Sequence, residues 1–178
     1  MPHSFRWWQP VAVILGVVIV SGMFAMVEIQ IEGAAGWAAN LPTWRIEKHW
    51  LLDIFWGGRA MTGYHAWVFP FIGVMLHMGF VLLGTWSWRL EARALAATML
   101  FWIIEDALWF ILNPAYGWFG LTPERVPWHK HWFLGVPLDY WTFTSTALVA
   151  LAWSYGPWRR KADALVAPVV PHGPAAGR

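Results

Sequence analysis

Four stretches of the chain are apolar for about twenty residues each, and segments rich in polar, glycine and proline residues separate them. An α-helix rises 1.5 Å per residue, so about 20 apolar residues cross the roughly 30 Å hydrocarbon core of a bilayer. The pattern predicts an all-α integral membrane protein with four transmembrane helices in an antiparallel bundle. The predicted spans are residues 11–32, 64–86, 94–113 and 136–156.

The first predicted span could instead be a secretory signal peptide. The apolar region of a signal peptide is about 7 to 15 residues long and is followed by a cleavage site with small residues. Here the apolar run is longer and leads into Glu28, Gln30 and Glu32. We therefore expect an uncleaved helix.

The first long connection is too polar to cross a membrane, but it is rich in aromatic residues. A helix that begins near Pro42 would place Trp44, Leu51 and Phe55 on one stripe and charged residues on another. This pattern is typical of an additional interfacial helix, lying in the membrane surface within the first outer loop. The predicted segments between and beyond the spans are an N-terminal segment (1–10), an outer loop (33–63), an inner loop (87–93), a second outer loop (114–135) and a disordered tail (157–178).

The composition agrees with a membrane protein and excludes several classes of site. Hydrophobic residues make up 58% of the chain and charged residues only 12%, whereas a soluble domain has about 25% charged residues. The basic residues form no long run, so we expect no nucleic-acid partner. Cysteine is absent, which excludes disulfides, thiolate-bound zinc, iron–sulfur clusters and covalently attached haem. Histidine, aspartate and glutamate remain as the strong metal ligands.

The distribution of Lys and Arg predicts the orientation. Seven of them lie on the side that holds both termini and five on the other side, and three of the seven directly follow the last span. Cytoplasmic loops of membrane proteins carry an excess of Lys and Arg. We therefore expect a bacterial inner-membrane protein with both termini in the cytoplasm.

The third predicted span contains two adjacent acids, Glu105 and Asp106. A charged residue near the middle of a bilayer costs about 2.5 to 3.5 kcal/mol on insertion scales, so such residues usually mark functional sites. On the predicted topology, Glu28, His65 and the loop histidines lie in the same outer half of the bundle. This predicts a polar cluster beneath the non-cytoplasmic surface.

Two interpretations of this cluster differ in chemistry. Carboxylates and histidines on different helices can bind a divalent metal, and the predicted ligands are Glu28, Glu105, His129 and His131. Alternatively, the histidines belong to an ordinary interfacial loop between Trp128 and Trp132. Haem is disfavoured as a cofactor because no second histidine lies at the depth of His77.

A purely structural role for the two acids is the other alternative. One acid would then bond to a Ser or Thr of the fourth span, and the other would pair with a basic group such as His65. Adjacent residues on a helix point about 100° apart, so Glu105 and Asp106 are not expected to face one ligand equally.

These features lead to three hypotheses for function. The first is a small membrane enzyme that acts on a lipid-like or quinone-like substrate, with Glu105, Asp106 and His65 as catalytic acids and bases. The second is a non-enzymatic binding or assembly subunit that holds a lipid, a pigment or a partner helix; glycines in the second span also permit a homo-oligomer. The third is a proton-coupled transporter.

Overall fold

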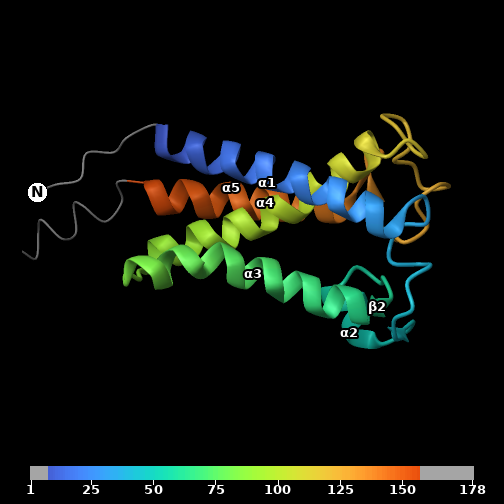
Figure 1. Cartoon of the computed structure of the whole chain (residues 1–178). Helices are drawn as coiled ribbons and strands as arrows, with labels where there is room; N and C mark the ends of the chain where they lie inside the picture. The colour runs from blue at the N-terminus through green and yellow to red at the C-terminus, as the bar shows by residue number, and fades with distance from the viewer. Residues whose placement is uncertain (1–7, 157–178) are drawn as a thin grey trace, which may run out of the picture.

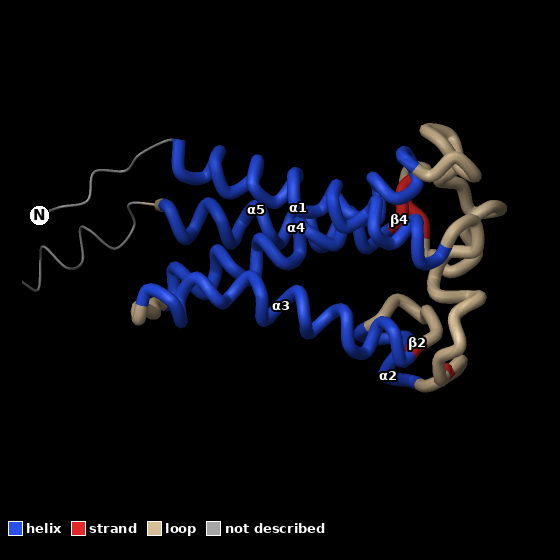
Figure 2. The backbone as a smooth tube through the Cα atoms, viewed as in Figure 1, coloured by secondary structure: helices blue, strands red, loops and turns tan. Residues whose placement is uncertain are grey.

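The structure is a computed structural model that describes residues 8–156. The described chain is mostly helical and has two small two-stranded sheets (Figure 2). The predicted disordered tail, residues 157–178, lies outside the described residues. The helices are α1 (Trp8–Glu32), α2 (Trp50–Phe55), α3 (Gly63–Leu83), α4 (Trp88–Leu112) and α5 (Leu138–Tyr155), and the strands are β1 (Arg45–Ile46), β2 (Met61–Thr62), β3 (Trp132–Phe133) and β4 (Val136–Pro137).

Side-chain caps explain where α3 and α4 begin. The Thr62 hydroxyl accepts a hydrogen bond from the backbone N–H of His65, and the Ser87 hydroxyl accepts one from that of Leu90. Because Ser87 caps α4, this helix begins six residues before the predicted span, and the predicted inner loop 87–93 is almost entirely helical. Gly84 ends α3 in the left-handed conformation, with φ 60°.

Helix α4 lies at the centre of the molecule and contacts α1, α3 and α5. Small residues at its surface, among them Ala96 and Ala97, allow close approach of the neighbouring helices. The Ser21 hydroxyl of α1 donates a hydrogen bond of 3.1 Å to the backbone carbonyl of Phe101 in α4. The two acids of α4 are therefore held by the most tightly packed helix of the described chain.

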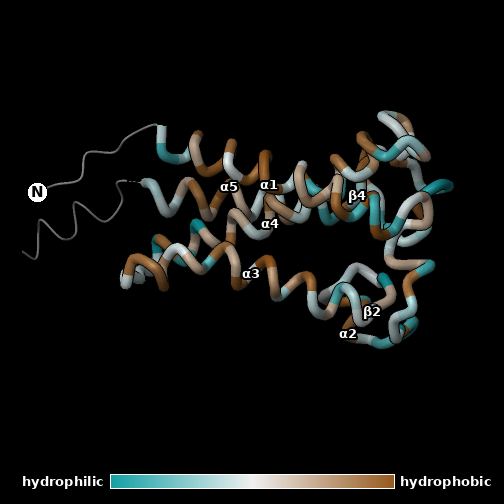
Figure 3. The backbone as a smooth tube through the Cα atoms, in the orientation of Figure 1, coloured by the Kyte–Doolittle hydropathy of each residue, from teal (hydrophilic) through white to brown (hydrophobic). Residues whose placement is uncertain are grey.

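Three helices of the described chain, α1, α3 and α4, are long and apolar enough to cross a membrane. Many of their apolar side chains are exposed, for example Ile19 and Met23 on α1 and Leu82 on α3. Hydrophobic residues recur along these helices (Figure 3). The prediction of a mostly helical membrane protein is confirmed to this extent. Helix α5, within the fourth predicted span, is not among the three.

The long connections gather at one end of the molecule. The loop between α1 and α3 and the loop between α4 and α5 lie at this end, and the short turn between α3 and α4 lies at the other (Figure 1). Helix α3 diverges from α1 and α4 toward the end that holds the two long loops, which we call the loop end of the molecule.

The first loop differs from the prediction of a helix starting near Pro42. Among the described residues of this loop the helix is α2, which begins at Trp50 where the His49 side chain accepts a hydrogen bond from the N–H of Leu51. Strand β1 pairs with β2 in antiparallel register, Arg45 opposite Thr62. This pairing takes the residues after Pro42 into a strand and thereby prevents the longer helix.

The second loop ends in a hairpin of β3 and β4. Leu134 and Gly135 form its two-residue turn, and both have positive φ, 51° and 74°. Two-residue hairpin turns with positive φ at both positions match the twist of the paired strands. The hairpin leads directly into α5 and fixes the position of its first turn.

Candidate functional site

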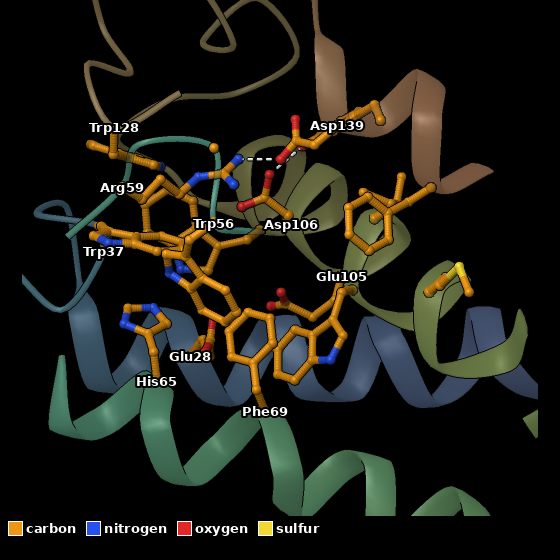
Figure 4. Close-up of a pocket in the computed structure, with 18 of the residues that line it drawn as sticks. Glu28, Trp37, Trp56, Arg59, His65, Phe69, Glu105, Asp106, Trp128 and Asp139 are labelled. Carbon is orange, nitrogen blue, oxygen red and sulfur yellow. Dashed lines mark hydrogen bonds and ion pairs between the residues drawn. The ribbon is translucent and has the colours of Figure 1, made fainter. Parts of the chain in front are cut away.

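A cavity of about 300 Å³ lies at the loop end, between α1, α3, α4 and α5 (Figure 4). Each of the four helices contributes side chains to it, and both long loops contribute as well. Its acidic lining residues are Glu28, Glu32, Glu105, Asp106 and Asp139. Its aromatic lining residues are Trp37, Trp56, Phe69, Trp102, Trp109, Trp128, Tyr140 and Phe143.

The two adjacent acids of α4 have different surroundings. Asp106 Oδ2 accepts hydrogen bonds from the Tyr140 hydroxyl, at 2.5 Å, and from His129 Nε2, at 3.1 Å. Glu105 is only 3% exposed, and its Oε1 atom has no hydrogen-bond partner among the described residues. Asp106 is thus fixed by protein contacts, whereas one oxygen of Glu105 remains free.

The acids of α1 approach Glu105 from the opposite wall of the cavity. The carboxyl groups of Glu28 and Glu105 lie within hydrogen-bonding distance of each other. The Tyr64 hydroxyl donates a 2.7 Å hydrogen bond to Glu28 Oε1. Glu32 Oε1 accepts a hydrogen bond from the backbone N–H of Ala38. These hydrogen bonds fix the positions of the Glu28 and Glu32 side chains, and Glu28 connects Glu105 to α3.

Four buried polar atoms have no hydrogen-bond partner within residues 8–156. They are Glu105 Oε1, Trp56 Nε1, Arg59 Nε and Trp109 Nε1, and all four belong to residues that line the cavity. Buried polar groups are nearly always hydrogen-bonded, so each exception needs an explanation. Their concentration around one cavity indicates a space that takes a polar ligand group or water.

A buried ionic network closes one side of the cavity. Arg59 forms an ion pair with Asp139 and also contacts His129 Nδ1. His129 in turn joins Asp106, and its Nδ1 atom is 3.6 Å from Asp139 Oδ1. Burial alone would lower the pKa of His129, but the Asp106 and Asp139 carboxylates outweigh it and raise this pKa above its ordinary value. The network joins both loops to α4 and α5.

His65 lines the cavity without touching a carboxylate. Its Nδ1 atom bonds with the Thr62 hydroxyl at 2.7 Å, and its ring stacks on Trp37 with a centroid distance of 4.0 Å. The acids of α4 therefore do not pair with His65, which the structural alternative named as a partner. Asp106 pairs with His129 and with a tyrosine of α5 rather than a Ser or Thr.

The four predicted metal ligands are not gathered in one place. Glu28 and Glu105 meet, His129 lies beside Asp106, and His131 is exposed and lines a second cavity. Within the described part of the chain, no group of three or more His, Asp or Glu residues could hold a metal ion. The structure thus gives no support to the predicted divalent metal.

His77 lies far from these acids along α3. Its Nε2 atom is 3.1 Å from Glu91 Oε1, and its Nδ1 atom is 2.6 Å from the backbone carbonyl oxygen of Gly73. These contacts give His77 a local role in joining α3 to the first turn of α4.

The second cavity, of about 720 Å³, lies between the two loops. It shares Gly36, Trp37, Arg59 and Trp128 with the first cavity. A Cβ atom on Gly36 would lie 2.5 Å from the Trp128 ring, so the wall between the cavities is closely packed at this point. We call the four shared residues the partition.

Sequence reasoning did not assign a role to Arg59, Tyr64 or Tyr140. Arg59 directly follows Gly57 and Gly58, which both have positive φ and turn the loop toward the cavity. A basic residue after two glycines in an aromatic loop was a usable but weak signal. Tyr140 lies one residue after Asp139, in the first turn of α5.

Comparison with known proteins gives no match: no family model, no curated protein and no solved structure is significantly similar to this chain. The function is therefore inferred from the geometry and chemistry of the cavity.

Proposed function

We propose that the protein is a small membrane enzyme that transfers protons to and from a lipid-like substrate in the cavity between α1, α3, α4 and α5. The observation that carries this proposal is the carboxyl group of Glu105. It is almost fully buried, lines an aromatic cavity and has one oxygen without a partner in the described chain. A carboxyl group that is costly to bury and has one oxygen without a partner is suited to react with a ligand.

The neighbouring groups have supporting roles in this proposal. Glu28 lies within hydrogen-bonding distance of Glu105 and acts as the second proton carrier. Asp106, fixed by Tyr140 and His129, is a positioning residue that holds the loops over the cavity. His65, which lines the same cavity, is placed to exchange protons with a substrate there.

The proposal places the cavity in the outer half of a four-span antiparallel bundle. Helix α5 has 18 residues, about 27 Å at 1.5 Å per residue, and it exposes Leu148, Val149 and Trp153. The excess of Lys and Arg on the side of the termini supports a cytoplasmic location for both. Because the chain contains no cysteine, a single cysteine can be introduced at position 86 or at position 134 and tested with a label that does not cross the membrane. On this topology the two positions are labelled from opposite sides. Labelling of both from one side would contradict this topology.

A binding or assembly subunit is the second candidate, and stacked aromatic rings favour it. Phe69 and Trp102 stack with a centroid distance of 3.9 Å and form a flat apolar wall. Such a wall suits a ring or a conjugated chain and requires no proton transfer. A proton-coupled transporter, the third hypothesis, has no specific structural observation in its favour.

Deuterium incorporation separates the enzyme from the binding subunit. Purified protein is reconstituted with a total lipid extract of the cells that express it naturally and is incubated in D₂O. Lipid mass spectrometry then measures deuterium at carbon positions. We expect incorporation with the wild type, a reduction of at least about a hundredfold with Glu105→Gln, and no reduction with Glu124→Gln, a control at an exposed acid.

Two results would contradict the proposal. One is the absence of carbon-bound deuterium with the wild type. The other is equal incorporation by the wild type and Glu105→Gln. A lipid that co-purifies with both proteins and carries no label would support the binding subunit.

A further inference from the structure

The charges around the cavity are not balanced. Arg59 is the only guanidinium or ammonium group in the described lining, and it is paired with Asp139. His129 lies beside Asp106. Within the described chain, Glu28 and Glu105 therefore face the cavity with no Lys or Arg partner, and Glu28 has polar contacts with Glu105 and Tyr64. In an apolar environment such a pair is stabilised by a proton or by positive charge on the ligand.

The aromatic walls favour the same sign of charge. The face of an aromatic ring carries negative quadrupole charge and attracts cations, most strongly for tryptophan. Trp102 and Trp109 belong to α4, like Glu105, and both line the cavity. One face of Trp102 is covered by Phe69. The carboxyl group of Glu105 and the two indole rings line the cavity together, a combination that favours positive charge on a ligand.

The lining also restricts the type of reaction. Its only Ser or Thr side chain among the described residues is Thr98, whose hydroxyl donates a 2.8 Å hydrogen bond to the carbonyl of Ala94 in its own helix. Among the described residues the lining contains no Ser, Cys or Lys, so its reactive groups are the carboxyl groups, His65 and Tyr140. All of these groups can donate or accept a proton, so proton transfer beside aromatic rings is the chemistry that the cavity favours.

We propose that the cavity isomerises an unsaturated lipid, moving a carbon–carbon double bond through a carbocation that Glu28, Glu105 and the tryptophan faces stabilise. This inference rests on the proposed function and adds the substrate class and the sign of the charge that develops. A cavity of about 300 Å³ is at the small end of ligand sites, so it holds the reacting segment of the lipid rather than the whole molecule.

The reaction balances without a co-reactant. The π electrons of the double bond take the proton of the Glu105 carboxyl group, which forms a C–H bond, breaks the O–H bond and leaves a positive charge on the other alkene carbon. The Glu28 carboxylate then removes a proton from the carbon on the far side of that charge, and the electrons of this C–H bond form the new double bond. The product has the same formula as the substrate. The proton now on Glu28 passes to water, and Glu105 takes a proton from water, which restores the starting state and lets deuterium from D₂O enter the product.

The first test locates the double bond. The lipids from the D₂O incubation are analysed by ozone-induced fragmentation, which reports double-bond positions. We expect an isomer of a host lipid with a displaced double bond and deuterium on the carbon that has become saturated. Label at a carbon next to a carbonyl, with every double bond in place, would overturn the inference and leave the proposed proton-transfer function standing.

The second test measures the sign of the charge directly. N,N-dimethyldodecylamine, which is protonated at pH 7, mimics the carbocation, and dodecanol and dodecanoate serve as neutral and anionic probes. Each is titrated against the protein in nanodiscs as an inhibitor of label incorporation. We expect the amine to inhibit at a concentration at least about tenfold lower than dodecanol does, because mimics of a reaction intermediate bind tightly.

Native mass spectrometry also measures how Glu105→Gln and Glu124→Gln bind the same three probes. The preference for the amine should fall at least about tenfold in Glu105→Gln and persist in Glu124→Gln. Equal inhibition by all three probes, or stronger inhibition by dodecanoate, would overturn the inference. If the wild type incorporates no label at all, the proposed function and this inference fail together.

Discussion

The adjacent acids of α4 should differ in how much stability the protein loses when each is replaced by its amide. Asp106→Asn removes the negative charge that accepts hydrogen bonds from Tyr140 and His129. Hydrogen bonds to a charged group contribute about 1.5 to 3 kcal/mol each, and the amide retains one acceptor oxygen. The Asp106 side chain is 27% exposed, so little of its charge interaction is lost to solvent screening. We expect a destabilisation of about 2 to 3 kcal/mol.

Glu105→Gln should cost almost nothing. One oxygen of Glu105 has no partner in the described structure, and the new amide can donate a hydrogen bond to Glu28. The free energy of unfolding should change by less than about 0.5 kcal/mol or rise, as is common when a reactive group is removed from a functional site. Glu105→Gln should therefore abolish turnover without unfolding the protein.

Thermal unfolding of the nanodisc-embedded protein, followed by tryptophan fluorescence at pH 7, distinguishes these outcomes. About 2 to 4 °C of Tm per kcal/mol gives an expected decrease of about 4 to 12 °C for Asp106→Asn and almost no change for Glu105→Gln. Glu124→Gln controls for the loss of an acid at an exposed position. Equal decreases for the two α4 variants would refute the assignment of one acid as anchored and the other as free.

Three further predictions concern the loops. The raised pKa of His129 means that its protonated form stabilises the fold. The wild type should therefore be more stable than His129→Asn below about pH 6.5, and this advantage should decline as the pH rises through the raised pKa. Unfolding measured at several pH values can check this. Gly36→Ala should displace the Trp128 ring and destabilise the protein by about 1 to 3 kcal/mol. Gly16→Ala is the control, because a Cβ atom there meets nothing within 4 Å. An unchanged free energy of unfolding for Gly36→Ala would contradict the close packing of the partition. Leu134→Asn should stabilise the hairpin by about 0.5 to 1 kcal/mol because asparagine tolerates positive φ, while Leu134→Val should destabilise it. If both variants change the free energy of unfolding in the same direction, the turn assignment is wrong.

The apolar pattern predicted the helices well because helix-forming segments of a membrane protein must be both long and apolar. The beginning of α4 was missed, since Arg89, Glu91 and Arg93 resemble a polar loop. Ser87 was the informative residue, because its hydroxyl caps the helix before those charges. A local capping interaction thus outweighed a composition that suggested a loop.

The candidate site could be predicted only in part. Glu105 and Asp106 stand out because acids in an apolar run are costly, and that cost is a local property of the sequence. Their partners are not local: Arg59 and Asp139 are separated by 80 residues and meet only after both loops have folded over the cavity. The pattern along one helix does not specify which loop residue reaches it, so His129 and His131 looked equivalent, although only His129 is buried.

The origin of the cavity walls has a consequence for biosynthesis. Glu28 is made early in translation, Glu105 is made much later, and Asp139 and Tyr140 follow in α5. Until α5 packs against α4, the acids of α4 lack the tyrosine and the ion pair that hold the loops in place. A nascent chain stopped before α5 should therefore be a substrate for membrane quality-control proteases, because its polar cavity wall is incomplete.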